Sequence, residues 1–424
     1  MAVVPAYADI RRRTIEIIDE QRIDAERDRD RVVQAAADAV SDYQRRAHLG
    51  EARALGDPAA MIERVVRSVA DFGVLTALLV RDDIEEIFIE GSTVSFIDGT
   101  GRLRRLSDPT TEAETRQVVE RLLSTSDRRL DTASPIVQAR VLDGTARLTA
   151  VIPPVADMLS ATIRRYALLR ETLDSLVSLG SLSGPVAGFL RMAASTTTSI
   201  VISGQPGAGK TSLLAALLHA APVEQCIRCC EEVRELHVPL VHGSYYEARP
   251  PGLDGAGEIP LRQLVKVILA MRPDRIVVGE VRGSEAFELT RAVNAGTAFA
   301  CTVHANSAKE ALDALVNAAL MAGENVSERV VRKVFGSSID IVVHLDRDGV
   351  RDEDGPLRRK VMEVLAVVPS LHDDFTVEPI FVRESMDGAL RWTGARPPAR
   401  LTRSIESSFG RDALESVFEP GFAA

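Results

Sequence analysis

The chain has 424 residues, 46% of them hydrophobic, and a formal net charge of −10. This length suffices for two or three domains with full cores, and the acidic balance argues against a protein that coats nucleic acid. No stretch approaches the roughly 18 consecutive apolar residues of a membrane-spanning helix, and the N-terminus lacks a basic segment followed by an apolar one. We therefore expect a cytoplasmic protein without a transmembrane segment, whose contact with a membrane is peripheral.

Cysteine usage is low, with four in the chain. So few cysteines do not make a disulfide framework, and we expect a reducing compartment. Cys226, Cys229 and Cys230 form a C-x-x-C-C cluster, a pattern that zinc sites also use. Structural zinc normally takes four ligands. These three lie on a predicted strand without a second C-x-x-C, so small buried strand residues are the favoured interpretation.

The first segment, residues 1–57, is predicted to be a helical extension. Arg, Glu and Asp are mixed with Ile, Val and Ala along most of it, as expected of one long helix with a solvated face. A helix that is merely exposed and a helix that binds a partner both fit this pattern.

Residues 58–169 are predicted to form a smaller α+β domain. An amphipathic helical pattern leads into short strand-like stretches separated by Gly91 and by the Asp98-Gly99 turn,. The expected elements are strands at 86–90, 94–97 and 103–106 and a helix at 112–123, followed by more strand-like sequence.

Two arginines of this domain, Arg140 and Arg147, flank a turn at Asp143-Gly144. Surface arginines usually have no special role. Their position at a turn makes a nucleotide contact one interpretation and an ordinary solvated surface the other.

Residues 170–185 are predicted to be a linker with a short helix, and a helix at 184–194 follows. From there to residue 345 strands and helices alternate, which is typical of a mainly parallel sheet with helices on both faces. The expected strands are at 198–203, 225–230, 275–279 and 298–303, and the expected helices are at 261–271, 284–293 and 308–321. Residues 346–424 are predicted to be a C-terminal accessory region of strands and a short helix, and no chemistry is assigned to them.

The second domain opens with a stretch that fits G-x-x-x-x-G-K-[ST] between a strand and a helix. Its glycines let backbone N–H groups converge on a phosphate, and the following helix directs its positive end there. Lys210 is expected to reach the phosphates and the Thr211 hydroxyl to ligate Mg²⁺. The predicted phosphate-binding residues are Gly204, Gln205, Pro206, Gly207, Ala208, Gly209, Lys210, Thr211 and Ser212.

Polar side chains stand at the ends of three further strands. Glu231, in the run CCEEVREL, is a candidate base for activating water. Glu280, in RIVVGEVRG, is a candidate carboxylate for holding Mg²⁺. His304, in TVHAN, ends a third strand. Because a parallel sheet brings its strand ends to one edge, we expect these side chains to gather beside the phosphate loop.

Together the phosphate loop GQPGAGKTS, the Glu231 cluster, RPDRIVVGEVRG and TVHANS resemble the secretion-superfamily ATPases, which drive type II secretion, type IV secretion and type IV pili. The order and spacing match over about residues 82–345, and SPIVQARVLDGTARLTAVIPPVA and TLDSLVSLGSLS look most like the tight-adherence (Flp) pilus branch. The resemblance implies a RecA-like ATPase core at 186–345.

The resemblance also implies a homo-hexamer that binds ATP and Mg²⁺ and works with an inner-membrane platform protein. Glu231 is then the general base, Glu280 the Walker B carboxylate and a metal ligand together with Thr211, and His304 a sensor of the γ-phosphate. Arg140 and Arg147 match the family's paired arginines that reach a bound nucleotide.

Two positions depart from the family pattern. Glu232 stands where the family usually has Asp, and Thr297 stands where a family histidine commonly lies. Two other classes of function are kept as alternatives. A nucleic-acid translocase should show a basic channel with interleaved aromatics, which 4% aromatic residues and an acidic chain disfavour,. A nucleotide-gated scaffold without hydrolysis is disfavoured because Glu231 and Glu280 are both present.

Overall fold

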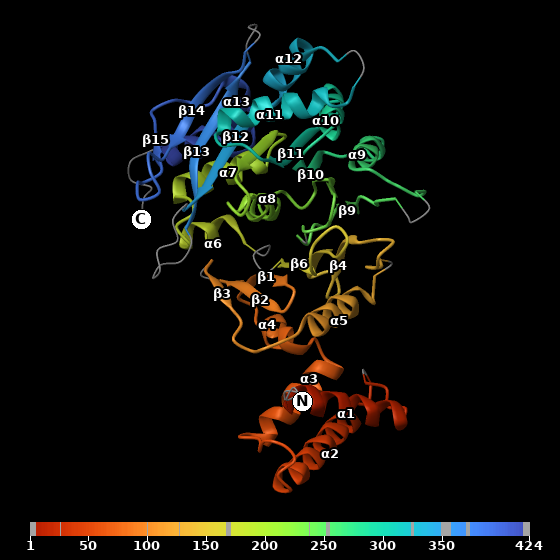
Figure 1. The fold of residues 1–424 in the computed structure, drawn as a ribbon. Coiled ribbons are helices and arrows are strands. Elements are labelled where there is room, and N and C mark those ends of the chain that lie inside the picture. The colour runs from red at the N-terminus through yellow and green to blue at the C-terminus, as the bar shows by residue number, and fades with distance from the viewer. Residues whose placement is uncertain are drawn as a thin grey trace. The chain divides into compact units, whose positions relative to one another are not determined.

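The structure is a computed structural model that describes residues 6–25, 27–99, 101–126, 128–166, 171–236, 238–251, 255–323, 326–348, 358–369 and 374–418. The chain divides into two compact units, Met1–Ala167 and Leu168–Ala424 (Figure 1). Within the described residues no helix is both long and apolar enough to cross a membrane.

The first unit begins with three packed helices, α1 (Ala6–Glu20), α2 (Arg29–His48) and α3 (Pro58–Ala70). The prediction of one long N-terminal helix is therefore wrong: helix α1 ends at Glu20, and Arg22 takes a positive φ of 51° in the connection to α2. A single straight helix would leave its apolar stripe in water, whereas the bundle buries it. The buried residues include Ile10, Ile17, Val32, Ala36 and Val65.

A six-stranded antiparallel sheet forms the rest of the first unit, in the order β3-β2-β1-β6-β5-β4. Helix α5 (Glu112–Leu123) packs its apolar residues on one face of it and begins with a Thr111–Glu114 capping box,. The 3-10 turn η1 (Gly73–Leu75) and helix α4 (Thr76–Val80) precede the sheet. The strands are β1 (Ile84–Glu90), β2 (Thr93–Asp98), β3 (Leu103–Arg105), β4 (Ile136–Val141), β5 (Ala146–Val151) and β6 (Ser160–Arg165).

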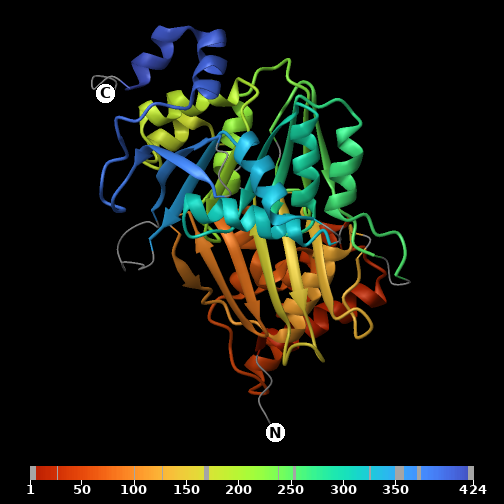
Figure 2. The same ribbon diagram turned by 90° about the horizontal axis from the view of Figure 1, so that it is seen from above.

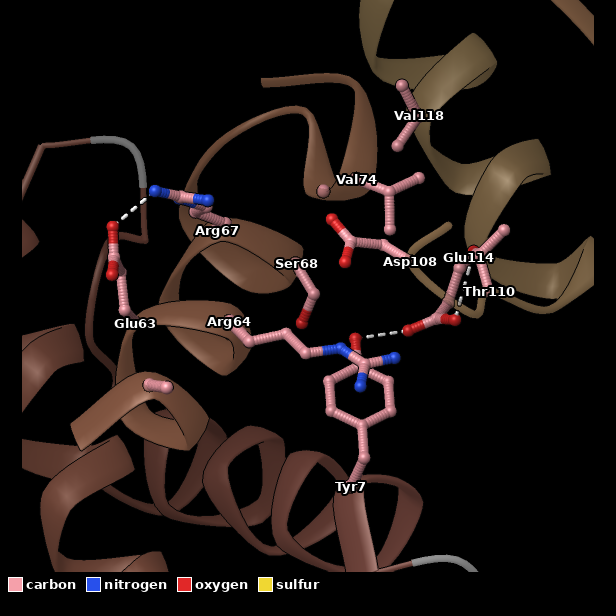
Figure 3. A pocket seen from close by; sticks show the side chains of 12 residues that line it. Tyr7, Glu63, Arg64, Arg67, Ser68, Val74, Asp108, Thr110, Glu114 and Val118 are labelled. Atoms are coloured by element: carbon pink, nitrogen blue, oxygen red, sulfur yellow. Dashed lines mark hydrogen bonds and ion pairs between the residues drawn. The ribbon is translucent and has the colours of Figure 1, made fainter. Parts of the chain in front are cut away.

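A cavity of about 240 Å³ lies between the three helices and the α+β part of the first unit, and Figure 3 shows the side chains that line it. The guanidinium carbon of Arg64 lies 3.9 Å from the centre of the Tyr7 ring, and the Tyr7 hydroxyl donates to Glu114, the residue that also caps α5. Burial raises the pKa of Tyr7 to about 12, so this hydroxyl stays a donor. These contacts fix α1 against α5.

The second unit holds a nine-stranded sheet in the order β15-β14-β13-β12-β7-β11-β10-β8-β9. Neighbours from β12 to β9 pair in parallel, as predicted for the core. Its parallel strands are β7 (Ile200–Gly204), β8 (Ile227–Glu231), β9 (Gly243–Glu247), β10 (Arg275–Val281), β11 (Ala298–Val303) and β12 (Ile341–Arg347).

Helices cover this sheet on both faces (Figure 2). A large core is shared by one face of the sheet and the helices α9 (Leu261–Leu269), α10 (Glu285–Asn294), α11 (Ala308–Leu320) and α12 (Glu328–Ser338). Helices α6 (Leu173–Ser178), α7 (Gly184–Ala194) and α8 (Lys210–His219) form a second contacting group, in which α8 packs on β7 and β11.

The C-terminal residues continue the same sheet instead of standing apart from it. Strands β13 (Arg359–Val368), β14 (Thr376–Val382) and β15 (Arg391–Trp392) add antiparallel to β12. Helices α13 (Ala399–Phe409) and α14 (Arg411–Phe418) follow, where the sequence predicted one short helix. Phe418 contacts Phe189 of α7 and Phe381 of β14 at ring-centre distances of 6.1 and 5.9 Å, which joins this end to the core,.

Candidate nucleotide-binding site

The phosphate loop connects β7 to α8, as the sequence predicted. Gly207 and Gly209 have φ values of 75° and 93°, a conformation that side chains other than glycine rarely adopt,. A Cβ atom at Gly204 would collide with the carbonyl oxygen of Leu345 in β12. The glycines are thus required by the backbone path, which turns back on itself and then enters α8, a helix N-terminus of the kind that binds phosphate,.

Lys210, the first residue of α8, is almost fully buried beneath this loop. Its Nζ donates to the carbonyl oxygens of Gly204 at 2.9 Å and Gln205 at 3.1 Å. It also lies 3.1 Å from Nδ1 of His304. A bound phosphate would compete for these donors, since an anion is a stronger acceptor than a carbonyl.

His304 connects Lys210 to Glu280. Its Nδ1 faces Lys210, and its Nε2 contacts Oε1 of Glu280. Burial and the neighbouring ammonium group of Lys210 lower the pKa of His304, so the ring is neutral although its contact with Glu280 has the geometry of an ion pair. Since Lys210 is only a donor, Nδ1 must accept, and the ring proton lies on Nε2, which is in contact with Oε1 of Glu280,. The other carboxylate oxygen of Glu280 pairs with Arg282 at 2.5 Å.

Glu231 ends β8, and its side chain packs against Gly279, the residue before Glu280. A Cβ atom at Gly279 would be 2.5 Å from Cγ of Glu231, so only glycine lets this side chain pack there. Its carboxylate accepts from the backbone N–H groups of Glu235 at 3.2 Å and Leu236 at 3.2 Å. Burial raises the pKa of Glu231 to about 8, although the two amide hydrogen bonds act in the opposite direction.

This pKa gives a testable pH dependence if Glu231 accepts the proton of the attacking water. Only the carboxylate form can do so, and its fraction grows as the pH rises toward about 8,. We expect the maximal rate of ATP hydrolysis to rise from pH 6.5, to pass half of its maximum near pH 8 and to level off only at higher pH,. A profile that stays flat from pH 6.5 to 9 would remove Glu231 as the base.

The donor set around the loop suits Mg²⁺ better than a metal held by protein side chains alone. Among the described residues there is no group of three or more His, Cys, Asp or Glu that could hold a metal ion. Mg²⁺ is typically bound by one or two side chains together with substrate phosphates and water. Thr211, half-buried next to Lys210, and Glu280 are the side chains that would hold it.

The side chains of the cysteine cluster do not point to one common site. Cys229 and Cys230 are both buried on β8, and consecutive strand residues point to opposite faces of a sheet. Burial raises the pKa of Cys230 to about 12, and it also raises that of Cys229. Both thiols are therefore protonated and buried, as the favoured interpretation of the sequence had it.

Arg140 and Arg147 belong to the first unit. They lie directly opposite each other on β4 and β5, and Arg164 of β6 is the next residue across the sheet. Neighbouring positions Ala139, Val141 and Leu148 are buried against α5, so the arginines occupy the opposite face. Arg147 donates to Gln138 at 2.8 Å.

Two arginines beyond residue 345, where the sequence predicted no chemistry, approach the phosphate loop. Arg347 of β12 lies over Gly207, and Nε of Arg359 in β13 donates to the Gly207 carbonyl at 3.0 Å. No local motif marks them, because their position depends on the pairing of β12 with both β7 and β13.

Residues 69–348 match the family described as type II/IV secretion system protein. A Mycobacterium tuberculosis protein provisionally described as a conjugal transfer protein is 33% identical over 65% of this chain and 80% of its own length. The type IV secretion system protein PtlH of Bordetella pertussis is 31% identical over 67% of this chain and 90% of its own. A solved structure of the VirB11 ATPase from the Brucella suis type IV secretion system is 24% identical, with a TM-score of 0.38 over 73% of this chain and 97% of its own.

The match spans more than half of the chain, and the fold and phosphate loop agree with it. The chain belongs to the type II/IV secretion system protein family. The particular branch, tight-adherence pilus assembly, stays a prediction from the sequence.

Proposed function

We propose that this protein is a motor that hydrolyses ATP with Mg²⁺ and drives assembly of a tight-adherence pilus or secretion of protein across the cell envelope. The observation that carries the proposal is the contact series Lys210, His304 and Glu280, which joins the phosphate loop to the end of β10. A glycine turn with no nucleotide would not need a buried lysine aimed at its own loop.

The residues divide the chemistry as follows. The loop N–H groups and Lys210 bind the phosphates, and Thr211 and Glu280 would hold Mg²⁺, which would neutralise negative charge on the phosphates. Glu231 accepts the proton of the attacking water. His304 reports the γ-phosphate because its hydrogen bond to Lys210 must change when Lys210 turns to the phosphates.

A small apolar cavity beside the loop supports nucleotide binding. It is lined by Leu176 and Leu179 from the segment around α6, by Gly209 and Ser212 from the loop and α8, and by Leu345 of β12. A flat base stacks well on such side chains while its phosphates lie on the adjacent loop. We propose that it holds the nucleobase.

Assembly and location extend the proposal. We propose a homo-hexamer attached to a platform protein at the inner face of the cell membrane, with no direct contact to nucleic acid. Support comes from the family membership and from helices α1 to α3, which form a separate packed layer.

Arg140 and Arg147 are proposed to stabilise charge that spreads over the γ-phosphoryl oxygens. We expect Arg140→Ala and Arg147→Ala each to lower the maximal rate of hydrolysis by about 100-fold or more, with little change in melting temperature because both side chains lie on the solvated face. Arg164→Ala on the same face is the matched control, since Arg164 contacts Glu86. Rates equal to wild type for both variants would exclude the two arginines from the site.

One observation favours the alternative function, a nucleotide-gated scaffold. With a pKa of about 8, Glu231 is largely protonated at pH 7 and would activate water poorly. Steady-state release of phosphate from Mg-ATP at pH 8.5 distinguishes the motor from the scaffold, with Lys210→Ala giving the background rate. Turnover above this background supports the motor, and tight ATP binding without turnover at this pH supports the scaffold.

A further inference from the structure

We propose that Arg347 contacts the phosphates of the bound nucleotide directly and that Arg359 positions the phosphate loop for it. The inference rests on the proposed ATP binding, and it adds two cations from outside the sequence motifs of the site. Both residues belong to the β12–β13 pair, in the same chain and the same compact unit as the loop.

The contacts place both arginines at the outer turn of the loop. A Cβ atom at Gly207 would lie 2.9 Å from Nη1 of Arg347. Nε of Arg359 donates to the Gly207 carbonyl at 3.0 Å, and its Cδ would lie 3.8 Å from a Cβ atom at Gly209. Gly207 lies among the loop residues whose N–H groups turn toward a phosphate, so a guanidinium beside it is within reach of the same anion.

The pairing of the two strands brings two guanidinium groups to the same place. Arg347 and Arg359 are direct partners across β12 and β13. Like charges directly opposite each other in an antiparallel pair destabilise the sheet, because their Cβ atoms are only about 5 Å apart. A cross-strand arginine pair is therefore a cost to the fold unless a negative group lies between or beside the two guanidinium groups.

The two described carboxylates beside Arg347 in the sequence have other partners. The carboxylate of Asp346 accepts from the backbone N–H of Arg347 at 2.8 Å. Asp348 is taken by Arg358, at 2.7 Å, and Arg358 also pairs with Asp387. In the described part of the chain the Arg347 guanidinium has no hydrogen-bonded or ion-paired partner, whereas its exposed neighbour Arg358 has two.

Bidentate geometry suits arginine to phosphate. Arg347 then acts on the same phosphates as Lys210 but from the outer side of the loop. Arg359 acts through the Gly207 carbonyl and is a positioning residue. This arrangement makes nucleotide affinity depend on the strand pair β12 and β13.

The test measures binding of fluorescently labelled ADP and the melting temperature with and without ADP. We expect Arg347→Ala to weaken ADP binding about 10- to 100-fold. It should melt without ADP at the wild-type temperature or higher, because a like-charge pair is removed, while its stabilisation by ADP falls. Arg347→Lys, which keeps the charge, should lose less affinity. Arg359→Ala should weaken binding and Arg359→Lys should restore part of it.

Arg358→Ala is the matched control and should bind ADP as wild type does, because its exposed ion pairs contribute little. Wild-type ADP affinity in both Arg347→Ala and Arg359→Ala would overturn the inference while leaving the proposed function intact. If wild type and Lys210→Ala bind ADP equally weakly, the proposed function fails, and the inference fails with it. A lower melting temperature of Arg347→Ala without ADP, with unchanged ADP affinity, would show that the arginine only stabilises the fold.

Discussion

Lys210→Ala is expected to lose both nucleotide binding and hydrolysis. The ammonium group is the nearly buried cation of the loop and already donates to Gly204, Gln205 and His304. Removing it leaves the phosphates with one charged donor fewer in a low-dielectric site, where a charge-assisted hydrogen bond is worth about 1.5–3 kcal/mol. It also breaks the connection to His304. We expect ADP affinity to fall at least about tenfold and turnover to reach background.

The measurement is ADP binding by titration calorimetry and phosphate release on the same preparations. Lys309→Ala is the control, because Lys309 is an exposed lysine that pairs with Asp374 at 3.9 Å. Such pairs add little to stability. Normal hydrolysis by Lys210→Ala would mean that the motif does not hold the substrate.

Glu231→Gln is expected to keep ATP binding and to stop hydrolysis. Gln can still accept from the amides of Glu235 and Leu236 and fits beside Gly279, but it cannot take a proton from water. Loss of a general base typically costs about 10²- to 10⁴-fold in rate. Single-turnover hydrolysis at pH 8.5, with ATP binding measured alongside, gives both quantities.

The pKa of Glu231 also predicts how the same substitution changes the melting temperature at different pH values. The pKa of Glu231 is raised on folding, so its effect on stability is most favourable below its unfolded value and is lost as the pH rises toward about 8,. Glu231→Gln should therefore melt higher than wild type at pH 8.5 and more nearly like it at pH 5. Glu232→Gln and Glu235→Gln are the comparison variants, and Glu232 and Glu235 become the next candidates for the base if Glu231→Gln hydrolyses ATP at the native rate.

The local sequence pattern was sufficient to predict much of the secondary structure of the second unit. The helix at 184–194 and the strand at 298–303 have the predicted bounds: the helix begins at Gly184-Pro185, where proline favours a helix start, and the strand is a short run that is buried throughout,. The phosphate loop was equally clear, since three glycines and the Lys-Thr pair occur between a strand and a helix. The gathering of Lys210, His304 and Glu280 followed from the rule that parallel strand ends meet at one edge.

The features that the sequence did not predict depend on contacts between residues that are distant along the chain. The N-terminal segment was predicted as one helix because its pattern is periodic throughout; the break at Arg22 comes from α1 folding back on α2. Strand β9 carries partly exposed residues and no clear alternation. Arg347 and Arg359 are separated by a charged stretch, and only the register of β12 and β13 places them side by side at Gly207. The raised pKa of Glu231 likewise reflects burial that no motif records.

The most direct test of the central claim is steady-state hydrolysis of Mg-ATP at pH 8.5 as a function of protein concentration, with molar mass from light scattering on the same samples. We predict that specific activity rises as six-subunit particles form and that Glu231→Gln particles of the same mass are inactive. Well-formed hexamers that bind ATP but release no phosphate, with or without membranes that carry the platform protein, would contradict a motor.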